Sequence, residues 1–223
     1  MCGIFGYLGS ERDVSGLIHS GLRDLEYRGY DSWGIAVARE NVIHIAKDIG
    51  KLQKYAPNLG SGTLALGHTR WATTGGVTQE NAHPHTDSEQ RIALVHNGIV
   101  ENAEELREEL IEDGFHFLSE TDTEVIVALI EREMRRGAET LMRAARRAFL
   151  RLEGLNAIAA IDSLRHEMVL IRDGSPLVLG QKDGAYYAAS DLGALAGQVE
   201  RIVHLRDGEI ASISLDHLSI FEI

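Results

Sequence analysis

The length, composition and charge of the chain predict an acidic globular protein of one domain. Its 223 residues are 44% apolar, enough for a hydrophobic core, and a net charge of −12 argues against a general nucleic-acid-binding protein. No apolar run approaches the roughly 18 residues that span a bilayer, and no signal peptide is evident. We therefore expect a cytoplasmic protein that has no membrane partner.

The first ninety residues predict several strands and one helix. Leucine and isoleucine recur at helical spacing over 13–26 and indicate an amphipathic helix. Apolar runs predict strands at 2–8, 34–38, 42–46 and 63–71. Glu40 and Asn41 separate the second strand from the third. Residues 72–89 then form a polar loop, which is unusually long for a compact domain unless it serves a site.

The second half predicts a strand, a helical block and then many short strands. The strand at 91–96 ends at Asn97-Gly98. Helices are expected at 103–113, 122–135 and 139–151, with Thr121 or Ser119 as the cap of the second. The short strands are expected at 155–161, 167–172, 176–180, 185–189, 201–204 and 209–214. Asp-Gly pairs at 173–174, 183–184 and 207–208 suit hairpin turns between them. We expect one domain over 1–223, with helices covering β-sheets.

Cys2 is the only cysteine, which excludes an internal disulfide and a multi-cysteine metal site. Removal of Met1 is favoured by the small residue that follows, and it would leave Cys2 with a thiol and a free α-amine. A free thiol, with a pKa of about 8.5, needs a base at neutral pH, and an α-amine with a pKa of about 8 can serve as that base. The alternative is a cysteine that only packs in the first strand.

Asn97-Gly98 offers a side-chain amide donor beside an unhindered backbone N–H. Two such donors can stabilise the oxyanion that forms during acyl transfer. The same dipeptide is also a common tight turn, so this alternative stays open.

An amino-acid substrate such as glutamine carries a carboxylate and an ammonium group, and the chain offers a partner for each. Arg70 can hold a carboxylate in a bidentate fork, and Asp122 can accept from an ammonium group. Thr73 and Thr74 lie on the same loop as Arg70 and offer hydroxyl contacts. The alternative for Asp122 is an acid at the N-cap or in the first turn of a helix.

Other motifs give little sign of a cofactor. Four histidines lie near these segments without the matching carboxylates or cysteines of a metal site, so we expect no metal. They are His68, His83, His85 and His96. No glycine-rich phosphate loop is present, so no nucleotide cofactor is expected. Trp33 and Trp71 are expected to pack in the core or to form part of a lid.

Six segments together resemble the class II glutamine amidotransferases, which use an N-terminal nucleophile. They are MCGIFGYLG (1–9), LEYRGYDSWG (25–34), GHTRWAT (67–73), NAHPH (81–85), HNGIVEN (96–102) and SETDTEV (119–125). They follow the family's order over essentially the whole chain. Within the family, YRGYDS, HTRWAT and SETDTE most resemble the glutaminase domains of glucosamine-6-phosphate synthases, also called glutamine–fructose-6-phosphate aminotransferases.

The resemblance implies an α+β fold, a four-layer αββα sandwich of the N-terminal-nucleophile hydrolase type. It implies that Cys2 is the nucleophile and that Asn97 and Gly98 form the oxyanion hole. The substrate-binding residues it implies are Arg28, Gly29, Arg70, Trp71, Thr73, Thr74 and Asp122. Among these, Arg70 and Thr73 would bind the glutamine carboxylate and Asp122 its ammonium group. Arg28 and Gly29 would line the nucleophile's end of the site, and Trp71 would belong to a mobile loop.

Three features depart from the family pattern. Thr74 stands where the family usually has a histidine, so we expect weaker glutamine binding. Trp33 replaces a residue that is usually small, and must either fill a cavity or alter a neighbouring loop. Complete synthases continue into sugar-isomerase domains that bind fructose 6-phosphate and accept the ammonia, whereas this sequence ends at Ile223.

We expect either an excised domain or a stand-alone subunit that supplies ammonia to a partner, and a homodimer is left open. Two other functions also stay open. One is an N-terminal-nucleophile amidase that acts on a different amide, and the other is a non-catalytic regulatory module that keeps the fold.

Overall fold

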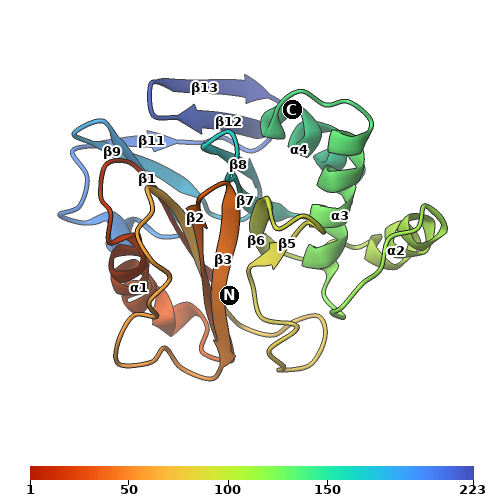
Figure 1. The fold of residues 1–223 in the computed structure, drawn as a ribbon, viewed down its shortest axis with the longest axis horizontal. Helices are drawn as coiled ribbons and strands as arrows, with labels where there is room; N and C mark the ends of the chain where they lie inside the picture. The colour runs from red at the N-terminus through yellow and green to blue at the C-terminus, as the bar shows by residue number, and fades with distance from the viewer.

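The computed structural model describes residues 1–223 and contains two antiparallel β-sheets packed against each other (Figure 1). The seven-stranded sheet has the order β11-β9-β10-β1-β4-β2-β3, and the six-stranded sheet has the order β13-β12-β8-β7-β6-β5. In the first sheet the strands are β11 (Arg201–His204), β9 (Val178–Lys182), β10 (Ala185–Ala189), β1 (Gly3–Leu8), β4 (Leu64–Arg70), β2 (Ser32–Arg39) and β3 (Val42–Ile49). In the second they are β13 (His217–Glu222), β12 (Glu209–Ser214), β8 (Glu167–Asp173), β7 (Asn156–Asp162), β6 (Ile92–Gly98) and β5 (His85–Thr86).

Helices cover the outer face of each sheet. In Figure 1, α1 lies on one side of the molecule, and the other three helices lie on the opposite side. The α-helices are α1 (Val14–Leu25), α2 (Ala103–Glu112), α3 (Asp122–Arg135) and α4 (Leu141–Phe149). Two short 3₁₀ helices, Glu26–Arg28 and Leu192–Leu195, complete the elements.

The alternating side chains of β1 explain how this strand joins two layers of core. Ile4 and Leu8 belong to the cluster between the two sheets, whereas Phe5 and Tyr7 belong to the cluster beneath α1. A third cluster, which includes Leu129, joins the six-stranded sheet to α2, α3 and α4. Three apolar layers therefore separate four layers of secondary structure, and the predicted αββα sandwich is confirmed.

Many predicted elements have the observed bounds, and the differences are local. The helix at 122–135 and the strands at 185–189, 201–204 and 209–214 are found as predicted. Thr121 is the N-cap of α3, because its side chain accepts a hydrogen bond from the Glu124 N–H over 3.4 Å. The last predicted helix is shorter, since it begins after the Thr140 cap. Strands β5 and β13 were not predicted.

The Asp-Gly pairs differ in what they connect. Asp183-Gly184 forms a hairpin between β9 and β10, with positive φ at both residues. The pair at 173–174 instead leads from β8 to β9, and the pair at 207–208 leads from β11 to β12. Both of these connections cross between the two sheets. The hairpin prediction was wrong there, because turn residues define the local backbone but not the sheet that the next strand joins.

The topology brings together the ends of three strands that carry predicted site residues. Cys2 directly precedes β1, which pairs with β4, and β4 ends at Arg70. Asn97 and Gly98 are the last residues of β6, paired with Ala157 and Asn156 of β7. The tight-turn interpretation of Asn97-Gly98 was therefore wrong, because both residues complete a strand. No helix of the chain has the length and apolar character needed to cross a membrane.

Candidate active site

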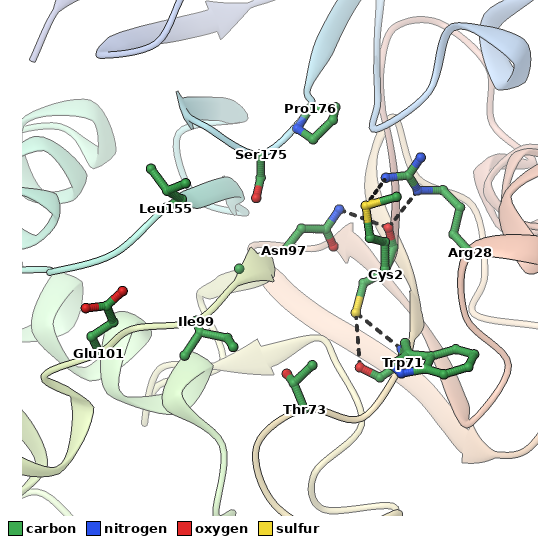
Figure 2. A pocket seen from close by; sticks show the side chains of 12 residues that line it. Cys2, Arg28, Trp71, Thr73, Asn97, Ile99, Glu101, Leu155, Ser175 and Pro176 are labelled. Carbon is green, nitrogen blue, oxygen red and sulfur yellow. Dashed lines mark hydrogen bonds between the residues drawn. The ribbon is translucent and has the colours of Figure 1, made fainter.

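A pocket of about 370 Å³ opens at these strand ends (Figure 2). It is lined by Met1, Cys2, Arg28, Trp71, Thr73, Asn97, Gly98, Ile99, Glu101, Leu155, Ser175 and Pro176. Six predicted site residues are therefore brought together: Cys2, Arg28, Trp71, Thr73, Asn97 and Gly98. The remaining predicted residues, Gly29, Arg70, Thr74 and Asp122, are not part of the lining.

Cys2 is fixed by hydrogen bonds to both its thiol and its carbonyl. Its Sγ accepts from the Trp71 backbone N–H over 3.2 Å. Its carbonyl oxygen accepts from Arg28 Nε over 2.9 Å and from Asn97 Nδ2 over 3.1 Å (Figure 2). Burial raises the pKa of the Cys2 thiol, and the Trp71 N–H and nearby positive charges only partly oppose this effect. The resting sulfur is therefore a thiol at neutral pH, and it needs a base to become a nucleophile.

Arg28 and Gly29 support the nucleophile in different ways. The buried Arg28 guanidinium lies 3.4 Å from the Asp191 carboxylate, which also accepts from the Tyr27 hydroxyl over 2.7 Å. Gly29 allows a close approach of the backbone, since a Cβ there would lie 2.6 Å from the Arg70 carbonyl carbon. Gly29 thus packs against the end of β4 and does not reach the pocket.

Asn97 and Gly98 lie where a side-chain amide and a backbone N–H can face the pocket. The Asn97 side chain bridges two groups, because its Nδ2 donates to Cys2 and its Oδ1 lies 3.1 Å from His68 Nε2. Gly98 has a φ of 144°, and a Cβ at this position would lie 2.3 Å from the Leu155 carbonyl oxygen. Only glycine fits here without strain.

The predicted charge pair lies beside the pocket and is engaged by backbone groups. Arg70 is 3% exposed, and its guanidinium donates to the carbonyl oxygens of Thr74 and Gly76. The Asp122 carboxylate accepts from the Val100 N–H over 2.8 Å and belongs to the first turn of α3. Burial lowers the pKa of Arg70, and the nearby Asp122 and Asp31 carboxylates only partly oppose this effect. Arg70 and Asp122, the two predicted partners of the substrate, therefore lie close enough for their charges to interact.

The loop after β4 forms the exposed side of the pocket. The Trp71 side chain is 43% exposed and meets the Tyr30 ring edge-on, with 5.6 Å between ring centroids. The Glu120 carboxylate holds the loop by accepting from the Gly76 N–H over 3.1 Å and from Asn81 Nδ2 over 3.0 Å. The hydroxyl of Thr73 borders the pocket, whereas Thr74 contributes its carbonyl to Arg70.

The buried histidines form a stacked group next to Asn97. The rings of His68 and His83 are stacked 4.2 Å apart, and His85 meets His83 edge-on at 5.1 Å. No group of three or more His, Cys, Asp or Glu side chains is arranged to hold a metal ion. Trp33 is 3% exposed within the cluster beneath α1, so it fills space in the core.

Sequence reasoning missed several residues of the site. Asp191 pairs with Arg28 from 163 positions away, and no local pattern marks it. Leu155, Ser175 and Pro176 reach the pocket from the start of β7 and the connection between β8 and β9. His68 was noticed only as a candidate metal ligand, although its place in HTRWAT, two residues before Arg70, was a signal of proximity to the site.

An αββα sandwich with a cysteine just before a central strand has the architecture of the N-terminal-nucleophile hydrolases. A family model described as a glutamine amidotransferase domain matches residues 57–218. The chain belongs to this family, and the resemblance of its motifs is confirmed.

Relatives refine this assignment. The glutamine–fructose-6-phosphate aminotransferase (isomerizing) of Thermus thermophilus is 44% identical over 227 residues, which cover 100% of this chain and 37% of the relative. The enzyme of the same name from Pyrococcus horikoshii is also 44% identical, over 100% of this chain and 38% of its own length. The chain thus spans well under half the length of these relatives.

Solved structures agree on the fold. Glutamine phosphoribosylpyrophosphate amidotransferase from B. subtilis matches with a TM-score of 0.83 and 29% identity, over 99% of this chain and 49% of that chain. A class II glutamine aminotransferase domain protein from Silicibacter pomeroyi matches with a TM-score of 0.67 over 99% of both chains. At 19% identity, the second match supports the fold alone.

Proposed function

We propose that residues 1–223 form one glutaminase domain, which hydrolyses the side-chain amide of L-glutamine to glutamate and ammonia. The observation that carries this proposal is the bond from Asn97 Nδ2 to the Cys2 carbonyl over 3.1 Å. It joins a side-chain amide donor to the residue that bears the only thiol of the chain. Membership of the glutamine amidotransferase family and the relatives named for glutamine chemistry support the same reaction.

The proposed reaction begins with the removal of Met1. This step frees the α-amine of Cys2 and also empties part of the pocket, because Met1 belongs to its lining. The free amine then takes the proton of the Cys2 thiol, either directly or through a water molecule. The raised pKa of the thiol makes such a base necessary at neutral pH.

The thiolate attacks the side-chain carbonyl carbon of glutamine, and a bond forms between Sγ and that carbon. The resulting oxyanion accepts hydrogen bonds from Asn97 Nδ2 and the Gly98 N–H. When the tetrahedral intermediate collapses, the C–N bond breaks and the protonated α-amine donates its proton to the leaving ammonia. Water then attacks the γ-glutamyl thioester, which releases glutamate and restores the thiol.

Binding of glutamine is proposed to use the remaining predicted residues. Arg70 holds the α-carboxylate with Thr73, and Asp122 accepts from the α-ammonium group. The Arg70 guanidinium now donates to two loop carbonyls, and we propose that the loop shifts so that these donors can turn to the carboxylate. Thr74 lacks an imidazole ring, so binding is weaker than with histidine at that position.

The ammonia acceptor is proposed to be fructose 6-phosphate, bound by a sugar-isomerase domain or subunit. The relatives are named as glutamine–fructose-6-phosphate aminotransferases, which supports this acceptor. The chain spans only 37–38% of their length, which leaves room for an isomerase domain. Mixing the chain with a separately produced isomerase domain should then yield glucosamine 6-phosphate and glutamate from fructose 6-phosphate and glutamine. A stand-alone subunit serving another acceptor would release ammonia without that product. A homodimer stays a prediction, which light scattering would test.

The central experiment compares wild-type protein with the Cys2→Ala variant in an assay for glutamate release. We expect the variant to lose essentially all turnover, because loss of a nucleophile removes about 10⁴–10⁶-fold of rate. Its thermal unfolding midpoint should match the wild type. Undiminished hydrolysis in Cys2→Ala would refute the assignment. A parallel screen of N-acyl amides tests the alternative amidase, and an inactive wild type lacking Met1 would favour a non-catalytic module.

A further inference from the structure

The oxyanion-hole amide of Asn97 can work in only one of its two orientations. Its Nδ2 end can donate to a negative oxygen, whereas its Oδ1 end would repel that oxygen. The two ends have nearly the same shape, so packing alone does not choose between them. Neighbouring groups must therefore fix the orientation, and the Cys2 carbonyl, which accepts from Nδ2 over 3.1 Å, is one of them.

His68 contacts the far end of this amide from the adjacent strand end of the other sheet. Its Nε2 lies 3.1 Å from Asn97 Oδ1 and 3.1 Å from the His96 carbonyl oxygen. A carbonyl oxygen can only accept, so Nε2 must carry a hydrogen. A nitrogen that donates must face the oxygen of the Asn97 amide, and this leaves Nδ2 directed toward Cys2.

The other ring nitrogen of His68 supports this tautomer. Nδ1 is buried and has no hydrogen-bond partner, so it suits an unprotonated nitrogen and not an N–H. The side chain is 0% exposed, and burial lowers the pKa of His68 to about 3. The ring therefore stays neutral, with its single hydrogen on Nε2, throughout the range in which the enzyme would work.

The backbone acceptor of His68 is itself held in place. The side chain of His96 is bonded to Thr123 Oγ1 over 3.1 Å and to Asn156 Oδ1 over 2.8 Å. These contacts tie the end of β6 to α3 and to β7. The position of the His96 carbonyl is thus fixed, and this acceptor orients the His68 Nε2–H. The same N–H then orients the Asn97 amide.

We propose that His68 is a positioning residue, which holds the Asn97 amide with its N–H donors toward the nucleophile and never touches the substrate. The inference rests on the proposed glutaminase function. Without the His68 donor, only the Cys2 carbonyl still favours this orientation, so the amide rotates more readily and can place Oδ1 in the oxyanion hole. Loss of one such donor lowers kcat by about 10²–10³-fold in related acyl-transfer sites.

Two substitutions separate the hydrogen bond from the bulk of the ring. His68→Leu removes the donor and fills a similar volume, so we expect kcat to fall by about 10²-fold. KM for glutamine should change by less than about threefold, because Arg70 and Asp122 remain. His68→Gln places an amide N–H near the position of Nε2 and should recover kcat to within about tenfold of the wild type.

His83→Leu is the matched control, since His83 is a buried imidazole stacked on His68 that makes no hydrogen bond to Asn97. It should keep kcat within about threefold if only the donor to Asn97 matters. In an Asn97→Ala background, adding His68→Leu should lower kcat by less than about twofold. Independent effects of the two substitutions, or an equal loss in His83→Leu, would overturn the proposal.

A wild-type measurement covers the case in which His68→Leu does not fold. Long-range ¹H–¹⁵N spectra should show the Nε2–H tautomer of His68 between about pH 6 and 8. An Nδ1–H tautomer or an imidazolium there would overturn the proposal. A wild-type chain that lacks Met1 and releases no glutamate would instead refute the proposed function, while the spectra would still test the orientation.

Discussion

The two sides of the pocket are held by different kinds of contact. One side, the strand wall, consists of Asn97 and Gly98 at the end of β6. The other side, the loop wall, consists of Trp71 and Thr73 after β4. Asn97 is 6% exposed and is hydrogen-bonded to Cys2 and to His68 of β4. Trp71 is 43% exposed and belongs to a loop that is held by Arg70, which donates to the loop carbonyls, and by Glu120.

The difference corresponds to two tasks. Donors that stabilise a transient charge act best when they are fixed before the reaction, because they then need no reorganisation. A wall that admits and encloses a substrate must open, and such segments come from the less stable parts of a fold. We therefore expect changes in the strand wall to lower kcat and changes in the loop wall to raise KM.

Gly98→Ala should give the largest effect, because the strand wall has no space for a Cβ. The φ of 144° and the approach of 2.3 Å to the Leu155 carbonyl would force the end of β6 to move. We expect kcat to fall by at least about 10²-fold, and the free energy of unfolding to fall by about 1–3 kcal/mol. Glutamate release and urea unfolding measure the two effects.

Gly184→Ala serves as the control for Gly98→Ala. Gly184 also has a positive φ, but nothing lies within 4 Å of its ideal Cβ, and it sits in the β9–β10 hairpin. It should lose about 1 kcal/mol of stability and keep full turnover. Equal losses of turnover in both variants would show that the strand wall is not special.

Arg70→Lys tests the loop wall together with the proposed carboxylate site. Lysine keeps the charge but cannot donate to the Thr74 and Gly76 carbonyls in the same fork. We expect KM for glutamine to rise by about 10–100-fold, with kcat within about fivefold of the wild type. Arg91→Lys, at a site paired with Asp162, is the control. A fall in kcat with an unchanged KM would contradict the division between the walls.

The Cys2 thiol lies between the two walls, and the pH dependence of its reactivity should reflect its burial. Burial raises the pKa of Cys2, which favours the thiol up to alkaline pH. The rate of alkylation by iodoacetamide should therefore rise about tenfold per pH unit, up to a midpoint above the ordinary pKa of a cysteine thiol. Protein lacking Met1 carries its ammonium charge closer to the sulfur and should react faster at the same pH. A midpoint near neutrality in the Met1-bearing form would refute this expectation.

The sequence predicted the residues that line both walls better than the contacts that hold those residues in place. Cys2, Asn97 and Trp71 were found because short motifs mark them, and α3 had the predicted bounds because Thr121 caps it. The support of the walls was missed, since it depends on contacts such as Asp191 with Arg28 that join distant segments. The same limit explains the two Asp-Gly pairs that cross between sheets.

The hydrogen bonds of Arg70 were also not predicted from the sequence. Its charge and spacing indicated a carboxylate partner, but in the structure its donors face loop carbonyls. A motif specifies which side chains a site needs. It does not specify which of these side chains are hydrogen-bonded to backbone groups of a neighbouring loop.

Glu120→Ala should give the smallest effect and tests how the loop wall is held. The Glu120 carboxylate accepts from the Gly76 N–H and Asn81 Nδ2, and these bonds lower its pKa. The bonds are therefore present above the ordinary pKa of a glutamate and are lost as the pH falls through the lowered value. We expect KM to rise only about threefold in the variant, because each exposed hydrogen bond contributes little.

Hydrogen exchange at the Gly76 amide reports on the same contact without any assay of turnover. Exchange should be faster in Glu120→Ala than in the wild type, because the amide loses its acceptor. Glu89→Ala, on an exposed segment after β5, should leave that rate unchanged. If exchange at Gly76 is equally slow without Glu120, then the donors to the loop carbonyls, Arg70 and Asn81, are enough to hold the loop. Arg70 is also proposed to bind the glutamine carboxylate. Glutamine binding would then break the contacts of Arg70 with the loop and allow the loop wall to move.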